Sequence, residues 1–146
     1  MSSWRQQAVI ESPLEDVWEL VRDPNRYPEW ASEIVEVTGL PTVEADASFQ
    51  QLTEDPDEPS GAHLVNFKIE DVDDEVHRIQ FRCVDSRTYL RCAVTEAQGN
   101  TFVDMETGVD QGDAEADTGE KTRDFFIRLG HKMLDGLRRT TGSRSG

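Results

Sequence analysis

The sequence is poor in cysteine and has no long hydrophobic run. Its two cysteines, Cys83 and Cys92, are too few for a disulfide framework and lack the spacing of metal ligands. No apolar stretch approaches the roughly 20 residues that a helix needs to cross a bilayer. The first ten residues include Arg5, Gln6 and Gln7, and no apolar core of a signal peptide follows them. We therefore expect a cytoplasmic protein without membrane insertion.

Positive charge is also scarce. The chain carries 15 Lys and Arg residues against 30 Asp and Glu residues, which gives a net charge of −15 at pH 7. Nucleic acids and acidic membrane surfaces bind proteins through clustered cations, so this balance argues against partners of either kind. A small molecule or a basic protein surface is compatible with it.

The length of 146 residues fits a single domain. We expect that domain to span residues 1–141 and to be followed by a flexible tail over 142–146, because the tail sequence GSRSG has little to bury. Two acidic stretches, 54–60 and 110–119, are poor in large apolar side chains and are expected to be mobile loops.

The first 30 residues predict one strand and two short helices. Residues 4–10 end in β-branched side chains and favour a strand. Ser12 and Glu15 have the spacing of a capping box around Pro13, so we expect Ser12 to cap a helix. An apolar stripe at helical spacing follows and consists of Leu14, Val17, Trp18 and Val21. Residues 25–30 predict one further short helical turn.

The middle of the chain predicts an antiparallel sheet, and its end predicts a long helix. Candidate strands span residues 34–40, 48–53, 63–70, 76–84, 88–96 and 101–109. Along the fourth of these, Ile79, Phe81 and Cys83 alternate with arginine and glutamine, so one face is buried and the other is solvated. The amphipathic pattern over 120–140 predicts a helix that lies across this sheet.

Three stretches carry a family resemblance. They are AVIESP at 8–13 running into Val17-Trp18, DPNRYPEW at 23–30, and IVEV at 34–37. In these residues the sequence resembles the START and pollen-allergen-like (SRPBCC) superfamily, on its polyketide cyclase/dehydrase and lipid transport branch. The resemblance implies an α+β helix-grip fold. In this fold a seven-stranded antiparallel sheet curls around a long C-terminal helix, and two short helices follow the first strand.

The resemblance also implies that the protein binds a small hydrophobic molecule, lipid-like or polyketide-like, in an apolar cavity between the sheet and the last helix. Tyr27 and Trp30 fall where family members build the rim of the pocket. An aromatic ring there either stacks on a planar ligand or plugs the open end of the sheet. The residues expected to bind the ligand are Tyr27, Trp30, Phe49, Val65, Phe67, Ile79, Phe81, Cys83, Leu90, Cys92, Met105, Phe126, Leu129 and Met133. No cofactor is expected, and the sequence indicates neither the ligand's identity nor the oligomeric state.

Two other functions stay open at this point. A polyketide cyclase, dehydratase or aromatase would need polar groups inside the cavity, but the alternation points Tyr89 and Arg91 outward unless a β-bulge turns them in. No catalytic constellation is visible. The third function is an acidic protein-interaction module with a vestigial cavity. The histidines, at positions 63, 77 and 131, are scattered, so we expect no metal site.

Overall fold

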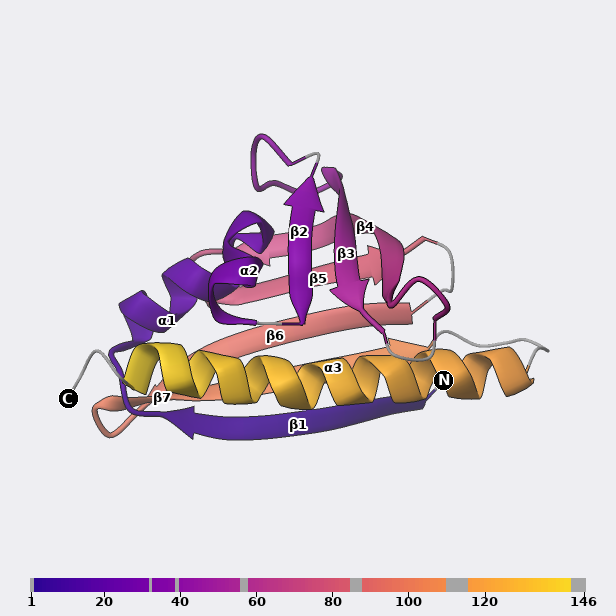
Figure 1. The fold of residues 1–146 in the computed structure, drawn as a ribbon. Coiled ribbons are helices and arrows are strands. Elements are labelled where there is room, and N and C mark those ends of the chain that lie inside the picture. Colours follow the sequence, from indigo (N-terminus) through magenta and orange to yellow (C-terminus); the bar gives the residue numbers. More distant parts are fainter. Residues whose placement is uncertain are drawn as a thin grey trace.

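The structure is a computed structural model that describes residues 2–31, 33–38, 40–55, 58–84, 88–109 and 116–142. Seven strands form one antiparallel sheet in the order β1-β7-β6-β5-β4-β3-β2. A long helix, α3 (Ala116–Gly142), lies across this sheet (Figure 1). Two short helices, α1 (Leu14–Val21) and α2 (Tyr27–Trp30), follow the first strand, with the 3-10 turn η1 (Pro24–Arg26) between them. The structure therefore confirms the helix-grip fold.

The strands agree closely with those expected from the alternation of side chains. They are β1 (Ser2–Ile10), β2 (Ile34–Thr38), β3 (Ser48–Glu54), β4 (Ala62–Asp73), β5 (Arg78–Cys83), β6 (Thr88–Ala97) and β7 (Asn100–Val109). β1 and β2 are consecutive in the sequence but lie at opposite edges of the sheet, because α1, η1 and α2 carry the chain from one edge to the other. From β2 onward each strand pairs with the next, and β7 returns to pair with β1.

The predicted capping box at the start of α1 is wrong. The helix begins at Leu14 with Pro13 in the capping position, and no side chain caps it. Ser12 is buried, and its carbonyl oxygen accepts a 2.7 Å hydrogen bond from Thr101 Oγ1 at the start of β7. Ser12 therefore belongs to the corner between β1 and α1, one residue too early to cap the helix.

α3 is longer than the sequence pattern predicts. It begins at Ala116 rather than near residue 120, and it ends at Gly142, inside the stretch expected to be a tail. Residues 110–115 of the expected acidic loop, and 143–146 of the tail, lie outside the described residues. The other acidic stretch is partly structured, because Glu54 closes β3 and Asp55 is buried.

Two glycines allow α3 to approach its neighbours closely. A Cβ atom at Gly136 would overlap the backbone carbonyl of Trp30, and one at Gly130 would overlap the amide oxygen of Gln6. Gln6 Nε2 also donates a 2.9 Å hydrogen bond to the carbonyl of Ile127. The helix is therefore held against β1 on one side and α2 on the other, in agreement with its packing on β1, β7 and α2.

The two faces of the sheet differ as predicted. The inner face, toward α3, carries the buried apolar side chains, whereas ion pairs cross the outer face from strand to strand, such as Arg5 with Asp104 at 3.1 Å and Arg82 with Glu70 at 2.6 Å. Tyr89 stays on the outer side, since its pairing register with β5 and β7 runs without a bulge. It is nevertheless only 5% exposed, because its ring lies over Gly108.

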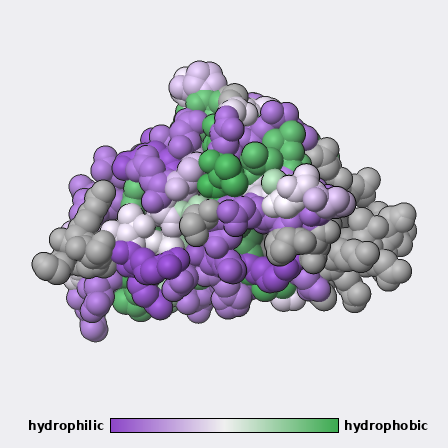
Figure 2. All heavy atoms as spheres, viewed as in Figure 1, coloured by the Kyte–Doolittle hydropathy of each residue, from purple (hydrophilic) through white to green (hydrophobic). Residues whose placement is uncertain are grey.

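The molecular surface is mostly hydrophilic on the side shown in Figure 2, in keeping with the net charge of −15. Hydrophobic surface gathers there over β2 and β3. Within the described part of the chain, no helix combines the length and the apolar character that crossing a membrane requires. A cytoplasmic location stays a prediction.

Candidate functional site

Aromatic side chains fill the centre of the space between the sheet and α3. Phe49, Phe67 and Phe81 come from three neighbouring strands, and their ring centroids lie 5.0–5.5 Å apart. Tyr27 of α2 joins them, with its centroid 6.2 Å from that of Phe81. All four side chains are at most 5% exposed. The predicted ligand-binding residues are thus brought together, and in the structure they contact one another.

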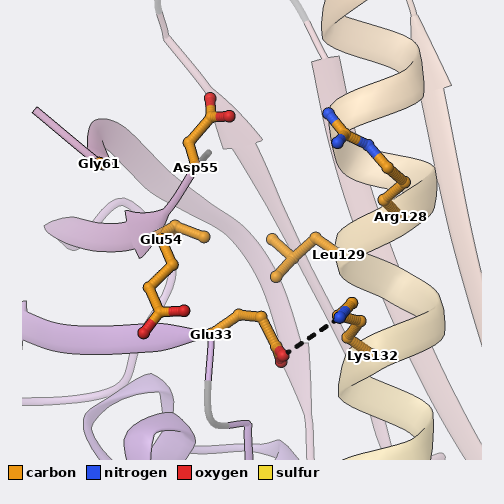
Figure 3. A pocket seen from close by; sticks show the side chains of 8 residues that line it. Glu33, Glu54, Asp55, Gly61, Arg128, Leu129 and Lys132 are labelled. Atoms are coloured by element: carbon orange, nitrogen blue, oxygen red, sulfur yellow. Dashed lines mark ion pairs between the residues drawn. The ribbon is translucent and has the colours of Figure 1, made fainter. Parts of the chain in front are cut away.

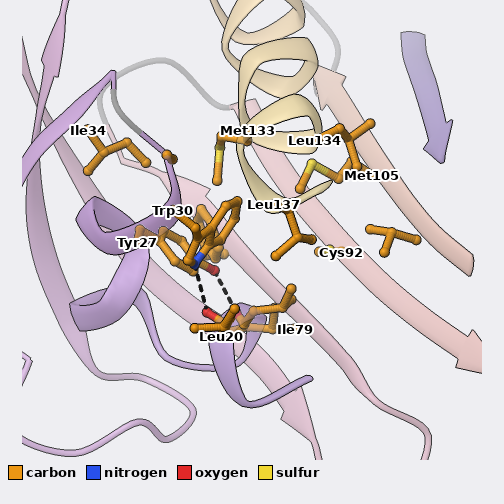
Figure 4. Close-up of a cluster of buried hydrophobic side chains, with 14 of the residues drawn as sticks. Leu20, Tyr27, Trp30, Ile34, Ile79, Cys92, Met105, Met133, Leu134 and Leu137 are labelled. Carbon is orange, nitrogen blue, oxygen red and sulfur yellow. Dashed lines mark hydrogen bonds between the residues drawn. The ribbon is translucent and has the colours of Figure 1, made fainter. Parts of the chain in front are cut away.

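Tyr27 and Trp30 close one end of this core. The Tyr27 hydroxyl donates a 2.8 Å hydrogen bond to the Val21 carbonyl, and Trp30 Nε1 donates one of 3.2 Å to the Leu20 carbonyl (Figure 4). These carbonyls belong to the last turn of α1, where helices leave acceptors unsatisfied. Burial of Tyr27 raises the pKa of its hydroxyl well above the usual value, so the group stays a neutral donor. Trp30 is 3% exposed, and both of its proposed roles, stacking on a ligand and plugging the sheet, stay predictions.

Among the described residues, the cavity between the sheet and the helices is small. A cavity of about 30 Å³ lies between α2, α3 and strands β5 to β7. A water molecule needs about 10–15 Å³ of such space, so there is room for about two or three waters. Of the residues expected to bind a ligand, Tyr27, Trp30, Phe81, Leu90, Cys92, Met105 and Met133 line this cavity. The deep open cavity that the family resemblance implies is therefore largely occupied by side chains in the described part of the protein.

The other expected binding residues have different positions. Phe49, Val65, Phe67, Ile79 and Cys83 are buried in the core beside the cavity, each at most 3% exposed. Leu129 lies in a second, larger pocket. The side chain of Phe126 lies outside the described residues. The sequence therefore identified the buried face correctly, but it did not indicate which of these residues adjoin free space.

The larger pocket lies at the mouth of the fold, between the end of β3 and α3 (Figure 3). Its volume is about 410 Å³, and its lining consists of Glu33, Thr53, Glu54, Asp55, Gly61, Arg128, Leu129 and Lys132. Carboxylates stand on the strand side and cations on the helix side, and Leu129 projects between them. We refer to this space as the mouth pocket. It is within the range of about 300–1,000 Å³ that is typical of ligand sites.

One ion pair spans the mouth pocket from side to side. Lys132 Nζ lies 3.8 Å from Glu33 Oε2, and the two side chains are 62% and 22% exposed. The same two residues also line an adjoining hollow of about 460 Å³, together with His131, Asp135 and Arg139 of α3. The ion pair thus marks the boundary between two hollows that follow the side of the helix.

A polar pair on β3, of which Thr53 lines the mouth pocket, was not predicted. Gln51 and Thr53 of β3 are 2% and 1% exposed, and Gln51 Nε2 donates a 3.1 Å hydrogen bond to Thr53 Oγ1. Both residues share the face of Phe49, because side chains alternate along a strand. The same alternation that places Phe49 on the buried face also predicts buried positions for Gln51 and Thr53, although both are polar. The inner face therefore offers hydrogen-bonding groups at its open end.

Neither cysteine has the character of a nucleophile. Both thiols are free and buried. Burial, assisted by the nearby charge of Asp104, raises the pKa of Cys92 to about 12. A thiol is reactive as its thiolate, so Cys92 is chemically inert at neutral pH.

Solved structures with this fold come from bacteria and plants. The protein XoxI from Bacillus cereus has a TM-score of 0.79 at 14% identity, with 100% of this chain and 99% of that chain covered. The Zhui aromatase/cyclase from Streptomyces sp. R1128 has a TM-score of 0.79 at 12% identity, with 99% and 96% covered. The ginseng major latex-like protein 151 from Panax ginseng has a TM-score of 0.72 at 11% identity, with 96% and 97% covered. At these identities the likeness concerns the fold alone.

Sequence comparison gives the family. A search of curated proteins returns no match. The family described as "Polyketide cyclase / dehydrase and lipid transport" matches residues 1–141, which is nearly the whole chain. This match, which covers nearly the whole chain, leads to one conclusion: the protein is a member of the polyketide cyclase/dehydrase and lipid transport family.

Proposed function

We propose that the protein binds a small amphipathic molecule, lipid-like or polyketide-like, between the sheet and α3. The hydrophobic body of the molecule would lie against the apolar inner face, and its polar end would stay in the mouth pocket. One observation carries the proposal. The mouth pocket leads from a charged rim to Thr53 and Leu129, which are only 1% and 4% exposed and belong to the inner surface of the fold.

Ligand entry requires the core to give way, because the internal cavity holds about 30 Å³. Met105 and Met133 line that cavity, and unbranched thioether side chains change shape at low cost. The aromatic rings of Phe49, Phe67 and Phe81 are more constrained, since each contacts the other two. We therefore propose that the ligand's hydrophobic body enlarges the cavity on the methionine side and leaves the three phenylalanines in place.

The direct test is mass spectrometry of small molecules released when the purified protein is denatured. An amphipathic molecule recovered in a fixed ratio to the protein would support the proposal. Recovery of nothing, together with capture of a basic protein that weakens steeply with salt, would instead favour the interaction module.

A matched pair of variants locates the site. Leu129→Trp fills the inner end of the mouth pocket, whereas Leu64→Trp enlarges a side chain that is 50% exposed in β4. Titration with a fluorescent fatty acid should give saturable binding to the unmodified protein and to L64W. L129W should bind at least about tenfold more weakly, a loss of roughly 1.4 kcal/mol. Equal binding by L129W and L64W, with both variants folded, would contradict the location.

Catalysis is a second candidate function, and one observation favours it. Turnover needs polar groups within reach of the bound molecule, and Thr53, which accepts a hydrogen bond from Gln51, lines the mouth pocket. If the protein is a cyclase or dehydratase of polyketide-like substrates, Gln51→Leu should abolish product formation while binding persists. If the protein is a carrier, neither the unmodified protein nor Q51L should form a product, and both should bind the molecule.

A further inference from the structure

Three potential metal ligands converge at the loop between β3 and β4. Asp55, Glu58 and His63 each offer one ligand atom, and these atoms all lie within 4.8 Å of one another. We propose that they form a binding site for a divalent cation, with Zn²⁺ as the preferred ion. The proposal differs from the expectation of no metal site, because only the fold brings His63, at the start of β4, beside the two carboxylates.

The donor set distinguishes this cluster from an ordinary acidic patch. It combines two carboxylates with one imidazole, and zinc sites in proteins commonly combine these donors. Asp55 as a whole residue is 9% exposed, whereas the side chains of Glu58 and His63 are 41% and 46% exposed. A buried anchor with two accessible ligands leaves coordination positions open to water or to another ligand.

The spacing of the donors fits a shared ion better than a direct contact. His63 Nδ1 lies 3.7 Å from Glu58 Oε1, which is longer than a hydrogen bond. Two ligands bound tetrahedrally to Zn²⁺ at about 2.1 Å are separated by about 3.4 Å. An ion between these two atoms would therefore require only a small contraction of the cluster.

The backbone of the loop holds the donors in place. The Asp55 amide donates a 3.0 Å hydrogen bond to the Gly61 carbonyl, the Glu58 amide donates to the Asp55 carbonyl at 3.1 Å, and the Gly61 amide donates to the Glu58 carbonyl at 2.9 Å. These bonds fix the relative positions of the residues that carry the two carboxylates. Ion binding would then have to order the donor side chains but not the backbone at these positions, which lowers its entropic cost.

The electrostatic surroundings also favour a cation. Asp55 lines the mouth pocket as well, so the proposed site lies at its rim. Glu33 and Glu54 line the same pocket, whereas Arg128 and Lys132 are the cations of its lining. Together with Glu58, the carboxylates outnumber these cations by four to two. A divalent ion would neutralise this excess of two negative charges and would place a Lewis acid beside the polar end of any molecule in the pocket.

Titration with Zn²⁺ alone tests the proposal on the full chain, stripped beforehand with a chelator. Isothermal titration calorimetry should show one ion per chain for the unmodified protein. His63→Gln and Glu58→Gln should each weaken binding at least about tenfold, since loss of even a supporting group around a metal commonly costs that much. His131→Gln, on the exposed side of α3, is the matched control and should bind as the unmodified protein does.

The result that overturns the site is equally definite. The first such result is the absence of saturable Zn²⁺ binding. The second is equally strong binding by H63Q and H131Q, as expected for diffuse attraction to an acidic surface. Circular dichroism confirms that each variant is folded. Because no organic molecule is present in this titration, failure of the metal site would leave the proposed ligand binding untouched.

Discussion

The indole of Trp18 donates a 2.9 Å hydrogen bond to Asp74 Oδ1, and this bond ties α1 to the turn between β4 and β5. Arg22, one turn further along the helix, donates to the same oxygen at 2.8 Å. His77 completes the contact, with its ring edge-on to the indole at 5.5 Å between centroids. Two segments 52 to 56 residues apart in sequence are joined in this way.

The Asp74 carboxylate makes this contact dependent on pH. Hydrogen bonds from Arg22 and then Trp18 lower the pKa of Asp74 below its ordinary value. A group with a lowered folded-state pKa stabilises the fold above its unfolded pKa, which is near 3.9, and the contribution is lost as the pH falls through the folded value. Asp74→Asn should therefore lower stability at pH 7 and leave it almost unchanged in strong acid.

The size of that effect is limited by solvent, because the Asp74 side chain is 60% exposed. We expect a loss of at most about 1 kcal/mol in urea unfolding at neutral pH. Glu19→Gln, on the exposed side of α1, serves as the control. A difference between D74N and the unmodified protein that persists below the folded pKa would contradict this account.

Tyr27→Phe should destabilise the fold by about 1–2 kcal/mol, because it leaves the buried Val21 carbonyl without its donor. Tyr89→Phe provides a comparison, since Tyr89 also donates through its hydroxyl, to Glu106 Oε2 at 2.5 Å. Glu106 retains Arg5 and Arg91 as ionic partners, so Y89F should cost less. Thermal unfolding should show a larger loss of stability for Y27F than for Y89F, and a larger loss for Y89F would argue against the role assigned to Tyr27.

Gly136→Ala should destabilise the protein by about 1–3 kcal/mol, although alanine is the better helix former by about 1 kcal/mol. Its Cβ would overlap the Trp30 carbonyl, which is backbone and can move only with α2. Gly130→Ala meets the end of the flexible Gln6 side chain instead, so its effect should be clearly smaller. The melting temperature should fall further for G136A than for G130A, and equal decreases would count against the close α2–α3 contact.

Cys83 and Cys92 should resist alkylation in the native protein at about pH 8, since both are buried and the thiolate is the reactive form. The pKa of Cys92, at about 12, keeps that thiol protonated. Counting thiols with a chromogenic disulfide should give none in the native protein and both after denaturation. Rapid reaction of either thiol in the native state would show that the core opens.

Much of the fold could be predicted because it depends on local patterns. Alternation along the strands placed Ile79, Phe81 and Cys83 on the buried face, and the structure confirms this for each of them. The N-terminus of α1 could not be predicted reliably. The spacing of Ser12 and Glu15 satisfies a capping box, but the tertiary bond from Thr101 holds Ser12 outside the helix.

The site was harder to predict than the fold. Whether the inner face encloses free space depends on how Phe49, Phe67 and Phe81 pack across three strands, and this is a property of side-chain geometry rather than of residue type. The convergence of Asp55 with His63 likewise follows from strand pairing, since Thr53 faces His63 across β3 and β4. Sequence spacing alone gives no sign of it.

The Glu33–Lys132 ion pair makes the surface beside α3 sensitive to the salt concentration. Lys132 is largely exposed, so dissolved ions weaken its attraction to Glu33 as the ionic strength rises. Concentrated salt would therefore weaken the contact that separates the two hollows beside α3. A longer molecule could be accommodated under those conditions than in dilute buffer.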